Sequence, residues 1–415
     1  MKHNRACDYR MVGDDLGPDV RSRSRMLGLD LLRAVAAWLV LLSHVAFWSG
    51  ASAEGVVGGL SARGELGVAV FFALSAFLLS TPFVRRALGE TVPWSAGTYL
   101  LRRAARILPA YLLALLGVVV AAAVIGGAAA DGLDAPMVLV HLVIGQGWTG
   151  ETFQSFTQTW SLTTEVTFYV LLPLVAAALA PLTKGATPTA SARRLLLLLG
   201  VIGGLGLLVQ LVAGLVPNGT LAGVLSTSAA GHAAWFALGA AVAVVVEAER
   251  AGAPVSQRPL LEVVRTSPGT LAALAGVLWV VSSTPVAGPR GLEPASGGEA
   301  LVAEVLYGLV ALCLLLAATT RGLTEVLAAS PLAGVVRWLG DISYAIFLWH
   351  VLVLQVVFAL LDLELFAAPF ALTLVLVTVL SVGLAHLSWN LLERPVLALA
   401  HRRPRAAEPQ PAPRE

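Results

Sequence analysis

The stretch LGLDLLRAVAAWLVLLSHVAF, residues 27–47, has the length and composition of a membrane-spanning helix. A helix needs about 20 largely apolar residues to cross the hydrocarbon core of a bilayer. This stretch also carries the ionisable residues Asp30, Arg33 and His44. Such side chains are costly at membrane depth and usually face a cavity or a partner. We therefore predict a span with one functional face, on which Asp30 and Arg33, one turn apart, can pair.

The rest of the chain repeats this apolar pattern. Of its 415 residues, 57% are hydrophobic and only 13% are charged, whereas a soluble domain carries about 25% charged residues. This excludes an ordinary soluble enzyme. The apolar segments that could span a membrane are 27–48, 64–84, 107–128, 160–181, 194–216, 229–247, 269–288, 299–320, 337–361 and 367–392. We expect an all-α polytopic transmembrane helix bundle of about ten spans over residues 27–400, between disordered tails 1–26 and 401–415.

Basic residues predict the orientation of the bundle. If the N-terminus is cytoplasmic and ten spans alternate, all 27 Lys and Arg residues except Arg63 and Arg290 fall on the cytoplasmic side. This is the distribution expected from the positive-inside rule. A full crossing at the short apolar piece 136–147 would spoil it, so we expect that piece to be re-entrant or interfacial. The sequence thus predicts a multi-pass protein of the cytoplasmic membrane, with both termini cytoplasmic and the first span retained as an anchor.

Three ionisable side chains from separate predicted helices fall at nearly one depth. At a rise of about 1.5 Å per residue, His44, Glu165 and His350 each lie about 20 to 22 Å from the cytoplasmic ends of their spans. A lone buried carboxylate is costly and rarely left unpaired. We therefore predict one buried chamber, in the outer half of the membrane, that contains all three. The alternative for His44 is a purely structural buried histidine.

A second polar set lies at the cytoplasmic helix ends and includes Arg33, Arg103 and Arg106. Arginine suits bidentate phosphate binding, so these residues predict a basic cytoplasmic mouth. Alternatively, Arg103 and Arg106 only anchor the bundle to lipid headgroups. Cys7 and Cys313 cannot build a disulfide framework, and no Cys or His cluster has the spacing of metal ligands. We expect no metal site.

Six motifs in order resemble the acyltransferase-3 family of integral-membrane acyltransferases. Arg33 and His44 form its Arg-x10-His signature, and Arg103 and Arg106 its Arg-x-x-Arg pattern within YLLRRAARILPAY, 99–111. The others are FFALSAFLLSTPF (71–83), TWSLTTEVTFYVLLPL (159–174), LGDISYAIFLWH (339–350) and WNLLERPV (389–396). The chain departs from the family at Leu31 and Ala76, where glycine is common, which bears on packing more than on chemistry. We expect no appended hydrolase-like domain after the bundle.

The resemblance implies an enzyme: an acyl-CoA-dependent O-acyltransferase that moves an acyl group, often acetyl, to a hydroxyl. The acceptor would be a carbohydrate or a glycosylated small molecule. Arg33, Arg103 and Arg106 would bind the CoA nucleotide at the cytoplasmic mouth. His44 would be the general base on the acceptor hydroxyl, since imidazole titrates near neutral pH. Direct attack and an acyl-histidine intermediate both remain open.

The other ionisable groups receive supporting roles in this interpretation. Glu165 would orient His44 or stabilise its imidazolium, as the carboxylate does in a serine-hydrolase triad. His350 or Tyr344 could donate a hydrogen bond to the thioester oxygen or to the acceptor. Acetyl-CoA is the expected co-substrate and membrane lipid the surrounding partner, with no nucleic acid. The Ala-, Arg- and Pro-rich, Lys-poor composition indicates a bacterial genome rich in GC.

The main alternative is a polytopic transporter or exporter of a glycan or lipid-linked sugar, without acyl-transfer chemistry. Ten spans with polar residues at mid-depth would suit it. Transporters often show internal repeats, and residues 27–216 and 229–400 show no convincing repeat. A purely structural membrane protein is disfavoured by Arg33, His44 and Glu165.

Overall fold

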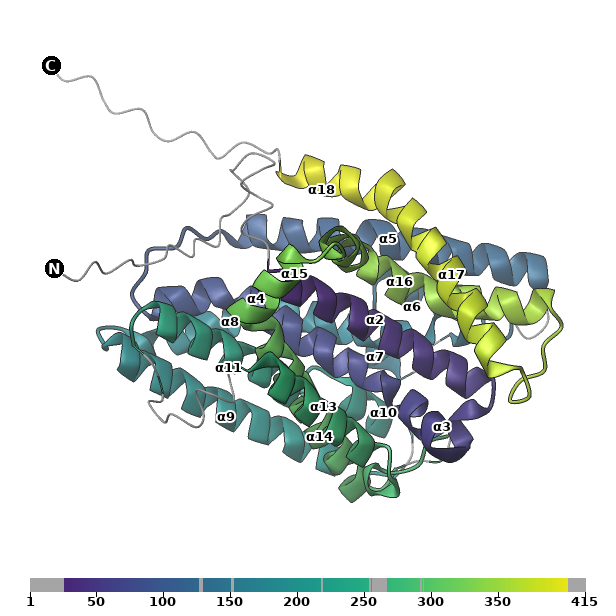
Figure 1. Cartoon of the computed structure of the whole chain (residues 1–415), viewed down its shortest axis with the longest axis horizontal. Coiled ribbons are helices and arrows are strands. Elements are labelled where there is room, and N and C mark those ends of the chain that lie inside the picture. Colours follow the sequence, from purple (N-terminus) through teal and green to yellow (C-terminus); the bar gives the residue numbers. More distant parts are fainter. Residues whose placement is uncertain are drawn as a thin grey trace, which may run out of the picture.

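The computed structural model describes residues 26–126, 130–150, 153–217, 219–253, 255, 267–291, 293 and 295–401. Within these ranges all regular secondary structure is helical, and the long helices lie beside one another in one bundle (Figure 1). The predicted all-α membrane bundle is confirmed. The two tails predicted at 1–26 and 401–415 lie outside the described residues, apart from their innermost positions.

Eight helical stretches of the described chain are long and apolar enough to cross a membrane. They contain α2 (Leu27–Trp48), α4 (Gly67–Ala87), α5 (Ala96–Ile125), α8 (Trp160–Thr183), α9 (Pro188–Ala213), α14 (Gly297–Thr319), α16 (Ala333–Leu360) and α17 (Phe370–Ser388). The remaining two predicted spans coincide with α11 (Ala233–Arg250) and with α13 (Pro268–Ser282), which has only 15 residues. Each predicted span therefore contains a helix of the described chain, and a crossing by α11 and α13 stays a prediction.

The other elements are short. They are η1 (Ala51–Ala53), α3 (Gly55–Ala62), η2 (Arg63–Leu66), α6 (Ala135–Leu142), α7 (Gln146–Thr149), η4 (Gln154–Thr159), α10 (Thr220–Thr227), η5 (Pro285–Ala287), α15 (Arg321–Ala329), the π-helical turn η6 (Trp389–Glu393) and α18 (Arg394–His401).

The apolar piece at 136–147 forms most of α6 and the first half of α7 rather than a span. The hydroxyl of Tyr111 donates to the carbonyl of His141 at 2.7 Å, and Nε2 of Gln146 donates to the carbonyl of Thr159 at 2.8 Å. Non-helical backbone at membrane depth is tolerated only when such internal partners satisfy it. The buried contacts therefore favour the re-entrant interpretation of this piece.

The helices divide into a central and a peripheral set. In the spanning stretch of α16, 83% of the residues are buried, against 17% in α8 and in α9. Small residues let the central helices approach closely, as is usual between membrane helices. A side chain on Gly239 of α11 would overlap the carbonyl oxygen of Ala73 in α4, and one on Gly67 of α4 would overlap that of Ala36 in α2. The packed centre therefore consists of α2, α4, α11 and α16.

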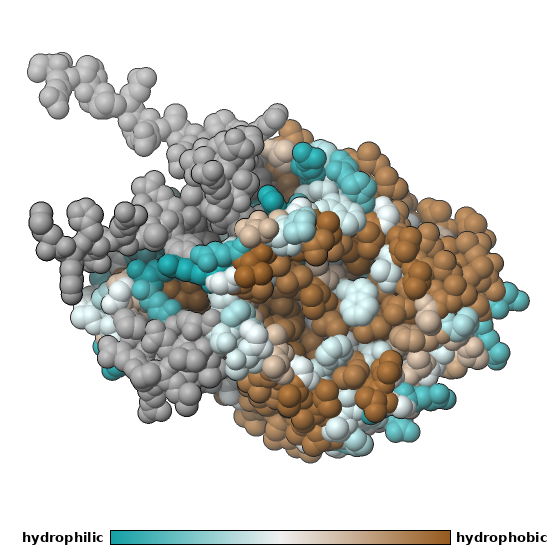
Figure 2. Space-filling model, in the orientation of Figure 1, coloured by the Kyte–Doolittle hydropathy of each residue, from teal (hydrophilic) through white to brown (hydrophobic). Residues whose placement is uncertain are grey.

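The outer surface of the bundle is apolar between its two ends. Figure 2 shows a mostly brown face with teal residues toward its left and right edges. Exposed large apolar side chains occur on several peripheral helices, for example Leu116, Val124, Leu197, Val201 and Val379. A soluble monomer rarely exposes so extensive an apolar surface. The chain is therefore a multi-pass protein embedded in a membrane.

Candidate active site

The predicted arginines line a single cavity of about 670 Å³, bounded mainly by α2, α4, α5, α8 and α16. The polar side chains on its walls are Arg33, Ser75, Arg102, Arg103, Arg106, Ser161, Glu165, Tyr169, Asp341, Ser343 and Tyr344. The structure thus brings together five of the seven residues singled out from the sequence. His44 and His350 are not among the residues that line this cavity.

Three of the arginines lie on the first turns of α5. The helix begins at Ala96, eleven residues before the predicted span, so Arg102, Arg103 and Arg106 project from a helix rather than from a loop. The Nε atoms of Arg102 and Arg103 are buried and have no hydrogen-bond partner in the described part of the chain. Because an unpartnered buried donor is costly, an anionic ligand would stabilise this end of the cavity.

Arg106 is held by side chains from the end of the bundle. Its guanidinium carbon lies 5.6 Å from the ring centre of Tyr344 and 5.3 Å from that of Trp389, in the range of cation–π interactions. Buried Glu393 places Oε2 3.8 Å from the guanidinium, and the Ser388 hydroxyl donates to its Oε1 at 3.1 Å. Trp389 and Glu393 belong to the π-helical turn η6, an element often found at functional sites. The turn therefore fixes the position of the Arg106 guanidinium.

Arg33 is held at the start of α2. Its Nη1 donates to Oδ1 of buried Asp30 at 2.8 Å, so the predicted pairing one turn apart is confirmed. Gly340 of α16 lies directly against Asp30, where a larger residue would clash. The close contact of α2 with α16 therefore places Arg33 beside Asp341 and Tyr344 on the cavity wall.

Glu165 of α8 lines the same cavity as the arginines. The hydroxyl groups of Ser75 and Tyr169 each donate to its Oε1 at 2.5 Å. The hydroxyl of Tyr99 donates to the carbonyl of Tyr169 at 3.1 Å, which places this part of α8 beside the first turns of α5. Arg103 is close enough to interact electrostatically with the Glu165 carboxylate. Glu165 is therefore at the depth of the arginines.

The two predicted histidines lie side by side. The ring centres of His44 and His350 are 5.0 Å apart, and the rings meet edge to face. Nδ1 of His350 is 2.8 Å from the carbonyl oxygen of Phe347. A carbonyl only accepts, so Nδ1 carries the hydrogen and Nε2 keeps its lone pair. Nε2 is buried and has no hydrogen-bond partner among the described residues, so its lone pair can accept a hydrogen bond from a ligand.

The single depth predicted for His44, Glu165 and His350 is corrected by the structure. Nε2 of Gln158 donates to the carbonyl of Leu348 at 2.8 Å, so Gln158 is level with α16 two residues before His350. Glu165 lies further along α8, about 10 Å nearer the arginines. The depth was counted from an α8 that begins at the outer surface, whereas η4 precedes it inside the bundle. Within the described residues, no hydrogen bond joins Glu165 to His44.

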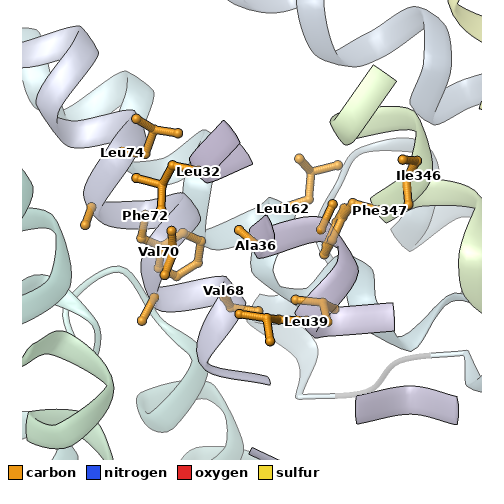
Figure 3. Close-up of a cluster of buried hydrophobic side chains, with 14 of the residues drawn as sticks. Leu32, Ala36, Leu39, Val68, Val70, Phe72, Leu74, Leu162, Ile346 and Phe347 are labelled. Atoms are coloured by element: carbon orange, nitrogen blue, oxygen red, sulfur yellow. The ribbon is translucent and has the colours of Figure 1, made fainter. Parts of the chain in front are cut away.

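A phenylalanine ring of the cavity wall also contacts the histidine pair. Phe71 of α4 and Phe347 of α16 both line the cavity, and their ring centres are 5.9 Å apart. The ring of Phe347 also contacts that of His350 at 6.0 Å. Figure 3 shows Phe347 among apolar side chains that include Ala36 and Leu162. Phe347 therefore connects the cavity to the histidine pair.

Comparison with known families agrees with this arrangement. The family model Acyl_transf_3, described as an acyltransferase domain, matches residues 26–388. The chain belongs to the acyltransferase-3 family. The match covers nearly all of the membrane bundle and five of the six motifs, and the sixth (389–396) lies just beyond it. The family resemblance is therefore confirmed, and the protein is a membrane acyltransferase. No curated protein and no solved structure matches the chain.

The candidate site includes residues that the sequence interpretation did not assign. Arg102, Ser75 and Tyr169 stand inside the quoted motifs, and Tyr169 follows Glu165 at helical spacing, so a signal for all three was present. The contact of Glu393 with Arg106 joins distant parts of the chain, and nothing local indicates it. In the described ranges, no group of three or more His, Cys, Asp or Glu side chains could hold a metal ion.

Proposed function

We propose that the protein transfers an acyl group, most simply acetyl, from acyl-CoA to a hydroxyl of a carbohydrate or a glycosylated acceptor. The observation that carries the proposal is the arginine-lined cavity, whose wall at Phe347 contacts the His44–His350 pair. Membership of the family supports acyl transfer in general. The cavity could bind an anionic donor, and a histidine of the pair could act as the base.

The shape and charge of the cavity fit a CoA thioester. Four arginines face it, and arginine is well matched to the phosphates of the nucleotide end. On α4 the lining runs from Leu79 to Val68, about 16 Å along the helix axis. An extended pantetheine arm could follow this wall, pass Glu165 and bring the thioester to Phe71 and Phe347. In this arrangement Glu165 contacts the acyl-CoA donor instead of orienting His44.

In the proposed reaction His44 removes the proton from the acceptor hydroxyl as the oxygen attacks the thioester carbonyl. The carbon–sulfur bond then breaks, and the CoA thiolate recovers the proton from His44. The imidazole of His350 packs edge to face on that of His44, with ring centres 5.0 Å apart, so we assign to His350 the orienting role first expected of Glu165. The Tyr344 hydroxyl donates to the carbonyl of Ile107 at 3.2 Å, so we assign its ring to holding Arg106.

We further propose that the arginine cavity opens to the cytoplasm, in the cytoplasmic membrane of a bacterium. The argument is the predicted distribution of basic residues, which places the start of α5 and both termini on the cytoplasmic side. Acyl-CoA is a cytoplasmic metabolite, so this orientation gives the donor direct access. Attaching a reporter enzyme to either terminus would test it, and an extracytoplasmic terminus would contradict it.

The function is tested by donor binding and by the fate of the acceptor. Purified protein in detergent should bind labelled acetyl-CoA. Mass spectrometry of envelope glycans and metabolites should show that a deletion strain lacks one acetylated species. The wild-type gene should restore that species, and the His44→Ala gene should not. If donor does not bind and the acetylated species persist after deletion, the proposal fails. A glycan that stays unmodified but changes compartment would indicate the exporter instead.

A further inference from the structure

A second cavity, of about 1050 Å³, is lined by α8, α9, α11 and the end of α4. None of its lining residues also lines the arginine cavity. A stack of three rings separates the two: Phe72 from the first cavity stacks on Phe236 with centres 4.7 Å apart, and Phe236 stacks on Phe168 at 4.2 Å. The second cavity is therefore a site of its own.

The long wall of this cavity is apolar. Along α8 the lining extends from Phe168 to Thr183, about 22 Å along the helix axis. This exceeds half of the roughly 30 Å hydrocarbon core of a bilayer, so it can accommodate a hydrocarbon chain across one leaflet. α8 is also one of the least buried helices of the bundle. A chain could therefore reach the cavity sideways from the membrane.

Hydrogen-bond donors gather at one end of the cavity, where α4 and α8 finish. They are supplied by Ser80, Arg86, Trp94 and Lys184. Oγ of Ser80 and Nε1 of Trp94 are buried and have no hydrogen-bond partner in the part of the chain that the structure describes. Arg86 and Lys184 are exposed at the mouth. No Asp or Glu is among the lining residues, so this end is suited to an anion.

We propose that this cavity binds an anionic, phosphate-bearing membrane lipid, with its hydrocarbon chain between α8, α9 and α11. The phosphate lies at the end marked by Ser80, Arg86, Trp94 and Lys184. Charged donors form the strong hydrogen bonds to phosphate, and basic residues near the cytoplasmic surface attract anionic lipids. Apolar walls favour burial of the chain. The site does not depend on the proposed acyl transfer.

The test measures retention of defined lipids by the purified full-length protein in native mass spectrometry. Phosphatidylglycerol is compared with phosphatidylcholine that has the same chains. Ala176→Trp fills the cavity, and its matched control is Ala178→Trp, an exposed position on the same helix that does not line it. The double variant Arg86→Gln/Lys184→Gln removes the charges, and Arg193→Gln removes an exposed charge elsewhere on the same side.

We expect the wild-type protein to retain phosphatidylglycerol over phosphatidylcholine. Ala176→Trp and the double charge variant should each lower retention at least tenfold, as expected for loss of hydrogen bonds to a charged group. Both controls should retain the lipid as the wild type does. The charge variant alters only exposed side chains, so it remains decisive if the tryptophan variant does not fold.

Two results would overturn the proposal. Equal retention by Ala176→Trp and Ala178→Trp, together with no effect of the charge variant, would mean that lipid adsorbs only to the apolar perimeter. Displacement of the lipid by palmitoyl-CoA but not by acetyl-CoA would instead place a donor acyl chain in this cavity.

Discussion

The arginine cavity and the histidine pair are neighbours on the same helices, yet their surroundings are opposite. The cavity carries four arginines, and two of their Nε atoms are without hydrogen-bond partners among the described residues. The pair includes His350, which is fully buried and, among the described residues, hydrogen-bonds only to backbone carbonyls. One region is suited to binding a charged ligand, whereas the other holds two imidazole rings in contact, with no ion pair to either among the described residues. Donor binding and proton transfer should therefore respond to different substitutions.

The largest expected effect is the loss of kcat when the histidine pair is altered. His44→Ala should lower kcat by about a hundredfold or more, because a general base contributes that much. Donor affinity should stay within twofold of the wild type, since His44 does not line the arginine cavity. CoA release with the natural acceptor gives kcat. His386→Ala is the control, because that histidine is exposed on α17. Wild-type turnover in His44→Ala would remove the base assignment.

Substitutions of the cavity arginines should instead weaken donor binding. Arg103→Ala and Arg106→Ala should each weaken acetyl-CoA binding by about tenfold, as expected for loss of a hydrogen bond to a charged group. Their effect on kcat at saturating donor should be small. Equilibrium binding of labelled acetyl-CoA measures the change, with the exposed Arg193→Ala as the matched control. Unchanged affinity in both variants would mean that these arginines only anchor the bundle to lipid.

A substitution in the π-helical turn η6 should have a smaller effect, and it tests whether the turn acts through Arg106. Glu393→Gln should raise KM for the donor a few-fold, because it removes the negative charge that lies 3.8 Å from Arg106. The double variant with Arg106→Ala should be no worse than Arg106→Ala alone, since the two residues act through one contact. Additive losses would show that Glu393 affects the site by another route.

The smallest effect concerns the boundary between the two regions. Phe347→Leu keeps an apolar side chain but shortens the wall between the cavity and His350. We expect a slight loss of transfer and a measurable release of CoA without acceptor, since water can then reach the thioester. Phe358→Leu is the control, because Phe358 packs on Trp48 away from the cavity lining. If both variants release CoA equally in the absence of acceptor, Phe347 does not keep water from the thioester.

The sequence predicted the helices well, because each long apolar segment has few ways to satisfy its backbone in a membrane. It also grouped Arg33, Arg103 and Arg106, which lie near helix starts and line one cavity in the structure. Their cytoplasmic location stays a prediction. The depth of Glu165 was missed because the count assumed that α8 begins at the membrane surface. The buried segment at η4, held through Gln158, has no periodicity that indicates this offset.

Contacts between distant parts of the chain could not be predicted. Tyr344 was expected to serve the reaction as a donor, but the fold directs its hydroxyl to the carbonyl of Ile107. Glu393, in the π-helical turn η6, lies 3.8 Å from Arg106, which is far away in the sequence. Local pattern and helix periodicity carry no information on such pairings.

Calorimetric titration of acetyl-CoA into purified His44→Ala, set beside its transfer activity, tests the central claim most directly. If different residues bind the donor and transfer the proton, His44→Ala should bind acetyl-CoA with the Kd of the wild type and show no measurable acyl transfer. Loss of binding together with transfer would contradict it, because His44 would then belong to the donor site.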